Sequence, residues 1–228
     1  GMNITTAIRN VLVGGLAGDA LTTGNKNVAV GMFALSTEDA NAGNTAIGYA
    51  ALEQQNAGAD VYNTAVGYAT GSTITTGGYN TLMGGFTGDA LTTGADNVAV
   101  GYAALSTEDT HGKNVAIGNY ALQDQDAGAD AYNVAIGYNA GKEVTTGLLN
   151  TIIGGLAGDA FTTGTRNVSL GYLALSAEDT GSRNVAIGAE ALLVANNDAN
   201  NYNTAVGDSA GEAVSSGTQN TIIGGLAG

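Results

Sequence analysis

Asn97-Val98-Ala99-Val100-Gly101 is one of thirteen copies of the motif that decides the fold of this chain. The motif is Asn, then Thr or Val, usually Ala, an aliphatic residue and Gly. The spacing from one copy to the next runs 17, 17, 19, 17, and this foursome occurs three times, in the blocks 10–79, 80–149 and 150–219. A fixed short period is typical of a solenoid. The copies begin at Asn10, Asn27, Asn44, Asn63, Asn80, Asn97, Asn114, Asn133, Asn150, Asn167, Asn184, Asn203 and Asn220.

Short strands and turns account for the whole of each repeat. The three residues after each Asn are mostly β-branched or small and are bounded by turn residues, which predicts a strand. Glycine every few residues disfavours helices, and the remaining Thr, Asp, Asn and Gly favour turns. We predict an all-β chain, a parallel β-solenoid with thirteen rungs of 17–19 residues. We expect a lead-in at residues 1–9 and a single repeat domain at 10–228, with super-repeats 10–79, 80–149 and 150–219 and a partial copy at 220–228.

Composition excludes several classes of partner. The 228 residues include 20 acidic and 6 basic side chains, for a net charge of -14. Nucleic acids and anionic membranes require clustered Lys and Arg, so neither is expected as a partner. The chain contains no Cys, which excludes disulfides and thiolate metal sites. No stretch has the length of a transmembrane helix and no signal peptide is visible. Because the sequence ends within a rung, we expect it to be part of a longer protein.

The strands are apolar on both faces. Side chains alternate along a strand, and we predict that its first and third residues, such as Val98 and Val100, point into the coil. The middle residue would then point outward, and no middle position carries a charge. An uncovered apolar stripe indicates an interface, so we predict a homo-oligomer, preferably a trimer, packed around it. The stripe comprises Leu12, Ala29, Ala46, Ala65, Leu82, Ala99, Ala116, Ala135, Ile152, Ser169, Ala186, Ala205 and Ile222.

The motifs carry a family resemblance. Asn-Val-Ala-Ile-Gly at 114–118 and 184–188, Asn-Thr-Ala-Ile-Gly at 44–48 and Asn-Val-Ala-Val-Gly at 27–31 resemble the head repeat of YadA-like trimeric autotransporter adhesins, which is related to repeats in phage tail fibres. The resemblance spans the chain, although these rungs are longer than the usual family repeat and the higher repeat of four rungs is not a general family feature.

What the resemblance implies is a left-handed β-roll, wound as a homotrimer and displayed on a cell or virion surface. Its expected function is that of a non-catalytic structural or adhesive segment of a surface fibre, for cell adhesion or host attachment. The partner would be an unknown cell-surface or matrix receptor. The resemblance leaves open whether the fibre belongs to a bacterial adhesin or to a phage.

The motif residues themselves indicate a structural role. Asn tolerates left-handed backbone and bonds neighbouring amides, so we predict that the thirteen Asn residues stack as a ladder at a solenoid corner. The Gly that follows each strand meets a turn requirement. Gly84-Gly85 is no phosphate loop, because no Lys-Ser/Thr follows it.

Catalytic and metal-binding residues are not apparent in the sequence. Acidic residues such as Asp19, Asp89 and Asp159 recur only once in each block of four rungs, too far apart to share a calcium ion. The single His111 is replaced by Asn41 and Gly181 in the other blocks, which gives a catalytic triad no support. We therefore expect no enzymatic activity, cofactor or metal.

A monomeric ligand-binding solenoid is the alternative. Tyr recurs at 62, 132 and 202 and at 49, 68, 102, 138 and 172, either as stacked corner residues or as a carbohydrate-contacting surface. Thr-Thr pairs begin at residues 22, 75, 92, 145 and 162 and suggest ice binding, but the array is interrupted by rungs that lack them.

Overall fold

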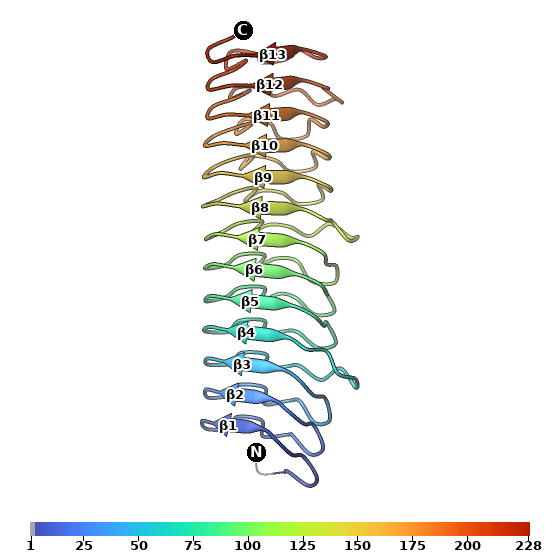
Figure 1. The fold of residues 1–228 in the computed structure, drawn as a ribbon. Helices are drawn as coiled ribbons and strands as arrows, with labels where there is room; N and C mark the ends of the chain where they lie inside the picture. The colour runs from blue at the N-terminus through green and yellow to red at the C-terminus, as the bar shows by residue number, and fades with distance from the viewer. Residues whose placement is uncertain (1–2) are drawn as a thin grey trace. The chain divides into compact units, whose positions relative to one another are not determined.

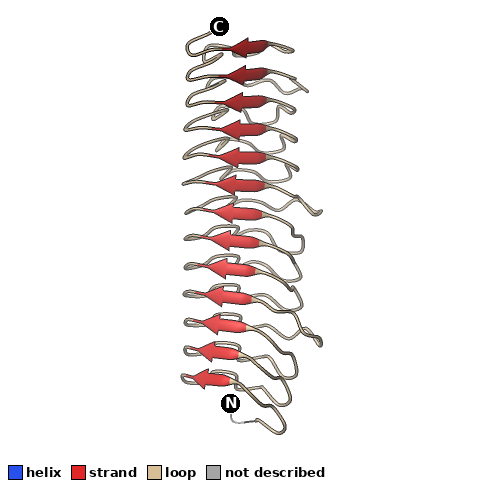
Figure 2. Ribbon diagram, in the orientation of Figure 1, coloured by secondary structure: helices blue, strands red, loops and turns tan. Residues whose placement is uncertain are grey.

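The computed structural model describes residues 3–228 and shows thirteen parallel strands of three residues, one in each rung, with no helix among these residues (Figures 1 and 2). The chain divides into two compact units, one ending at Lys113 and the other beginning at Asn114. The predicted all-β parallel solenoid with one strand per rung is confirmed within each unit. The single-domain organisation stays a prediction.

In the first unit, every strand pairs with the next along the chain, motif against motif. Val11, Leu12 and Val13 lie beside Val28, Ala29 and Val30, and the same register continues through the unit. The strands are β1 (Val11–Val13), β2 (Val28–Val30), β3 (Thr45–Ile47), β4 (Thr64–Val66), β5 (Thr81–Met83) and β6 (Val98–Val100).

The second unit repeats the arrangement. Its strands also pair in sequence order, and each begins directly after the Asn of its motif. They are β7 (Val115–Ile117), β8 (Val134–Ile136), β9 (Thr151–Ile153), β10 (Val168–Leu170), β11 (Val185–Ile187), β12 (Thr204–Val206) and β13 (Thr221–Ile223).

The predicted orientation of the strands is wrong. The middle residue points into the coil, and the first and third residues point outward. A three-residue strand in a narrow coil has room for only one inward side chain, which explains why that position is usually Ala. The predicted oligomer-facing stripe is therefore the core: Ala29, Ala46, Ala65, Leu82, Ala99, Ala116, Ala135, Ile152, Ser169, Ala186 and Ala205 are fully buried, and Leu12 and Ile222 are half-buried.

A second core column explains the higher repeat of four rungs. The residue eleven positions after each Asn is buried in all but the last complete rung, and its chemistry alternates. In the first unit it runs Leu21, Glu38, Gln55 and Ile74, then Leu91 and Glu108 begin the series again. The second unit continues with Gln125, Val144, Phe161, Glu178, Ala195 and Val214. Each block of four rungs thus has its own polar and apolar core layers.

The Asn residues form the expected ladder. The Asn150 side chain accepts a hydrogen bond from the Asn167 main-chain N–H at 3.0 Å and donates one to the Gly164 carbonyl at 2.8 Å. The same pair of bonds recurs at Asn27, Asn63, Asn80 and Asn133. The left-handed backbone, however, belongs to the residue before the Asn: Arg166, for example, has φ 58°.

A glycine ladder closes each strand. Gly154 has φ 139°, a conformation that other residues rarely adopt, and a Cβ there would lie 2.3 Å from the Gly171 carbonyl oxygen. The corresponding glycines of the other rungs share this positive φ. Stacking one rung on the next therefore requires Gly at this position.

We predict that Asn150→Ala destabilises the chain by about 1–3 kcal/mol for each of the two buried groups it leaves without a partner, the Asn167 N–H and the Gly164 carbonyl. Urea unfolding followed by circular dichroism measures the change. Replacement of the exposed Asn56 by Ala is the matched control. Equal stabilities of the two variants would contradict a supporting role for the ladder.

Candidate functional site

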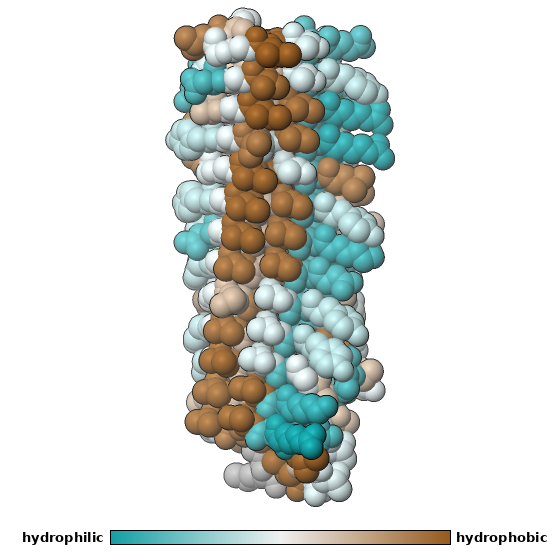
Figure 3. All heavy atoms as spheres, in the orientation of Figure 1, coloured by the Kyte–Doolittle hydropathy of each residue, from teal (hydrophilic) through white to brown (hydrophobic). Residues whose placement is uncertain are grey.

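The outward strand face is the main surface feature of both units. Its two columns of side chains are mostly Val, Ile, Leu and Met, with Thr in some first positions, and they run side by side over successive strands (Figure 3). Ile47, Met83 and Leu170 are 38%, 44% and 39% exposed. We call this surface the aliphatic face. It comprises residues 11 and 13, 28 and 30, 45 and 47, 64 and 66, 81 and 83, and 98 and 100 in the first unit, and the first and third residues of β7–β13 in the second.

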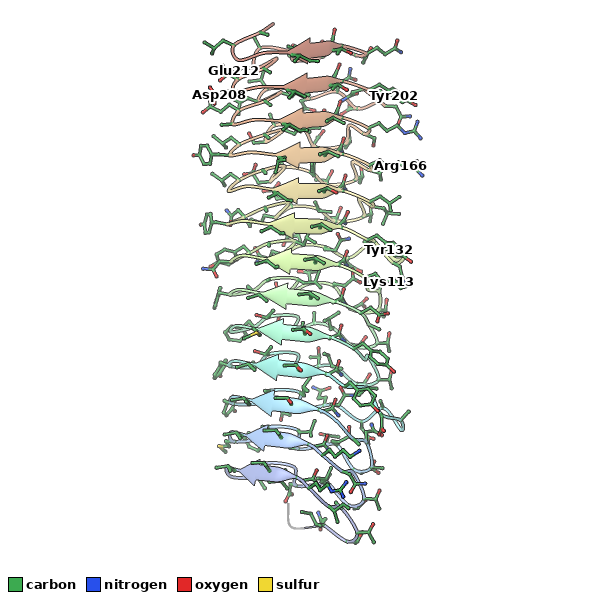
Figure 4. All side chains as sticks on the ribbon, viewed as in Figure 1. Lys113, Tyr132, Arg166, Tyr202, Asp208 and Glu212 are labelled. Atoms are coloured by element: carbon green, nitrogen blue, oxygen red, sulfur yellow. The ribbon has the colours of Figure 1, made fainter. Side chains whose placement is uncertain are left out.

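One border of the aliphatic face is formed by the residue directly before each Asn, and we call it the start edge. Five of the six Lys and Arg residues occupy this position, together with four tyrosines. In the second unit, Tyr132, Arg166 and Tyr202 project from the same side (Figure 4). The members are Arg9, Lys26, Gly43, Tyr62, Tyr79, Asp96 and Lys113, and in the second unit Tyr132, Leu149, Arg166, Arg183, Tyr202 and Gln219.

Arg183 and Tyr202 contact each other along the start edge. The Arg183 guanidinium donates a hydrogen bond to the Tyr202 hydroxyl, and its central carbon lies 5.3 Å from the centre of the Tyr202 ring. A cation held against an aromatic ring is favourable at partly exposed sites. The contact therefore holds the cation of Arg183 at the border of the aliphatic face.

The opposite border is formed by the two residues after the Gly that ends each motif, and we call it the end edge. In the first unit its aromatic rings contact each other on five consecutive rungs, with centroid separations of 5.8, 5.1, 5.2 and 5.9 Å. These rings belong to Phe33, Tyr49, Tyr68, Phe86 and Tyr102.

In the second unit the end edge changes from aromatic to acidic along the chain. Tyr120 and Tyr138 lie 6.3 Å apart, and Tyr172 follows. Glu190 and Asp208 then occupy this edge after β11 and β12. Asp208 lies on the side of the strands opposite Arg166 and Tyr202 (Figure 4).

The repeated tyrosines therefore lie on two different borders. Tyr62, Tyr132 and Tyr202 are on the start edge, whereas Tyr49, Tyr68, Tyr102, Tyr138 and Tyr172 are on the end edge. The predicted stacking holds for Tyr49 and Tyr68, whose rings are nearly parallel at an interplanar angle of 11°.

The threonine pairs bond the backbone of the next rung. The Thr22, Thr75, Thr92, Thr145 and Thr162 hydroxyls each donate to a carbonyl oxygen one rung further along, at 3.0–3.2 Å. The first threonine of each pair is half-buried and only the second is exposed. This arrangement gives the first threonine of each pair a structural role, and ice binding by the second stays an untested alternative.

Buried carboxylates are a feature that the sequence interpretation missed. Glu38 has no exposed surface and accepts hydrogen bonds from the Ala40 and Asn41 main-chain N–H groups and from the Asn41 amide. Burial raises the pKa of Glu38, although these donors oppose the shift. Glu178 is equally buried, and burial raises its pKa against hydrogen bonds from Gly181 and Asn197. The missed signal was a Glu at the position that holds Leu21 in the rung before Glu38 and Phe161 in the rung before Glu178.

His111 lies in the loop after one of these carboxylates. Ligand atoms of Glu108, Asp109 and His111 lie within 4.8 Å of one another, a geometry that could hold a metal ion. However, His111 Nδ1 is 2.9 Å from the Thr110 hydroxyl, and the His111 N–H donates to Glu108 Oε1. These contacts close the loop, as Asn41 and Glu38 do in the preceding block.

Residues 3–228 enclose no pocket, and no helix long and apolar enough to cross a membrane occurs among them. The chain matches no protein-family model, no curated protein and no solved structure. The aliphatic face and its two edges are therefore the candidate functional surface.

We predict that the free energy of unfolding falls as the pH rises above 4.5, the ordinary pKa of a Glu side chain. The fall continues until the pH has passed the raised pKa values of Glu38 and Glu178 in the folded chain. In that window the folded chain retains protons that the unfolded chain has released. The stabilising contribution is thus fully present below pH 4.5 and lost above the folded pKa values.

Urea unfolding of the wild type and of Glu38→Gln/Glu178→Gln across this pH range tests the prediction. The double variant should show a weaker pH dependence, and Glu212→Gln, at an exposed position, should leave it unchanged. Identical pH profiles for wild type and the double variant would show that these two carboxyls do not cause the effect.

Proposed function

We propose that this chain is a non-catalytic structural and adhesive segment of a surface-displayed fibre in which three copies associate through the aliphatic face. The observation that carries the proposal is the face itself, two columns of mainly aliphatic side chains that stay partly exposed on the described chain. Contiguous exposed apolar surface of this kind marks interaction sites. Burying it costs no backbone hydrogen bonds, because the strand backbone already pairs within each unit.

The repeated architecture favours self-association. Each rung presents an aliphatic residue at the third strand position and Val or Thr at the first, so the column of third residues continues along each unit. An identical copy offers the only partner surface certain to have the same period. A three-fold arrangement accords with the resemblance of the Asn-Val-Ala-Ile-Gly motifs to YadA-like heads, and a left-handed coil is part of the same proposal.

An adhesive role follows from the division of surfaces in such an assembly. With the aliphatic face at the centre, the polar loops on the far side of each coil remain in solvent. They carry many of the carboxylates of a chain with a net charge of -14, which keeps the assembly soluble. We propose that these outer loops display the receptor-binding surface on a cell or virion.

Ile136→Lys on the aliphatic face should dissociate the assembly while leaving the monomer folded, because the side chain points outward. Light scattering on a size-exclusion column measures the mass. The wild type should have about three times the 22.4 kDa chain mass, and Ile136→Lys the mass of one chain. Val194→Lys, at a 43% exposed position off this face, is the control and should remain assembled. A wild type with the mass of one chain would refute the proposed assembly.

A carbohydrate-binding solenoid is the second candidate, and the aromatic column of the first unit favours it. Tyr68 is 53% exposed between Tyr49 and Phe86, and such a column offers ring faces to successive sugars. This candidate requires a monomer in solution. It predicts that Tyr68→Ala weakens oligosaccharide binding measured by calorimetry, whereas Tyr79→Ala on the start edge does not. Undiminished binding by Tyr68→Ala would reject the candidate.

A further inference from the structure

We propose that neighbouring copies associate in parallel and level with each other, with the start edge of one against the end edge of the next, and that Arg183 pairs with Glu190 and Asp208 of the neighbouring copy. This inference rests on the proposed self-association and adds the contacts that set its direction and register. The molecule that covers the aliphatic face is a second copy of this chain.

The two guanidinium groups on the start edge of the second unit are not used for ion pairs within their own chain. Arg166 is exposed and Arg183 is half-buried, on consecutive rungs. Neither forms an ion pair with any residue in the range 3–228. In a chain with 20 acidic side chains, two adjacent guanidinium groups without a carboxylate partner are unexpected. Their charges are therefore available to a carboxylate outside the chain.

The end edge provides the complementary charges at the same level. Glu190 is two residues beyond Gly188, where the motif of β11 ends, and Asp208 is directly after Gly207, one rung further on. Neither is ion-paired among the described residues. Arg183 and Glu190 thus flank β11 from its two ends, one cationic and one anionic. The labelled Arg166 and Asp208 mark these two sides in Figure 4.

Closure of the assembly fixes the register. In a ring of identical copies, the start edge of one copy meets the end edge of the next, and any shift along the axis would accumulate into an open helix. Rungs of the same number must therefore be level. Arg183 then faces Glu190 of the neighbour, with Asp208 about 4.8 Å further along, within reach of the same guanidinium.

Other rungs have matching residues at the same level. The two residues that flank one strand are Lys26 and Phe33, Leu149 and Leu156, or Arg166 and Tyr172. With rungs level, Lys26 and Arg166 of one copy lie near the aromatic rings of Phe33 and Tyr172 of the next. Leu149 of one copy likewise lies near Leu156 of the next. An inverted arrangement would bring rungs of different number together and would lose this matching.

The first test is charge reversal in the full chain. Arg183→Glu should weaken association about tenfold or more, because it places like charges at every interface of the ring. Glu190→Arg/Asp208→Arg should weaken it comparably. Combining all three changes should restore the mass and affinity, as each contact is then re-formed with reversed polarity. Asp126→Arg, in an exposed loop of the same unit, is the control. Circular dichroism checks that each variant is folded.

The second test is covalent. The chain has no native Cys, so Arg183→Cys/Glu190→Cys introduces the only two thiols, at opposite ends of β11. Oxidation should link copies into closed species on a non-reducing gel, and Arg183→Cys/Asp126→Cys should not. If the wild type assembles but the Arg183→Cys/Glu190→Cys variant forms no such links, the proposed register is wrong and the proposed function stands. The same holds if the wild type assembles and the charge-reversal variants associate normally. A monomeric wild type would overturn the proposed function and this inference together.

Discussion

The buried Asn ladder is the constraint on which the rest of the structure depends. Most of these Asn side chains bond two backbone groups of a neighbouring turn, as Asn150 does for Asn167 and Gly164, and all but Asn10 and Asn220 are buried. Buried backbone groups have to be paired, so the ladder fixes where every strand begins. Strand register, the glycine that ends the motif, and the two borders of the aliphatic face all follow from that starting point.

The sequence predicts the strands well and their orientation badly. Asn and Gly mark both ends of Val98–Val100 and of every other strand, so periodicity alone locates them. The prediction of strand orientation was wrong because apolar residues occupy both faces of each strand, and hydrophobicity alone does not distinguish the inner face from the outer one. Size separates the faces in the rungs with a central Ala: Ala99 fits a narrow coil and Val98 with Val100 does not. The prevalence of Ala at the middle position was the usable signal, although Leu82 and Ile152 occupy the same place in other rungs.

The borders of the aliphatic face could be predicted only in part. The tyrosine rows are visible in the sequence, but their separation onto two borders depends on the three-residue strand between them. The left-handed residue before each Asn directs Arg183 outward beside Tyr202, a contact between rungs that no local pattern predicts. Buried Glu38 was likewise missed, because Glu is rarely fully buried unless it is partnered, and its partners lie in the loop that follows.

The polar core layers also limit how such a chain can grow or shrink. Glu178 takes donors from the following rung, at Asn197 and Asn201, and Gln55 bonds Asn63 of the rung after it. A rung carrying one of these side chains is therefore not interchangeable with its neighbours. Gain or loss of a single rung would separate such a side chain from its partners in the following rung. Gain or loss of a whole block of four rungs keeps the order of the layers, so inherited length differences are expected to come in whole blocks, each the length of 80–149.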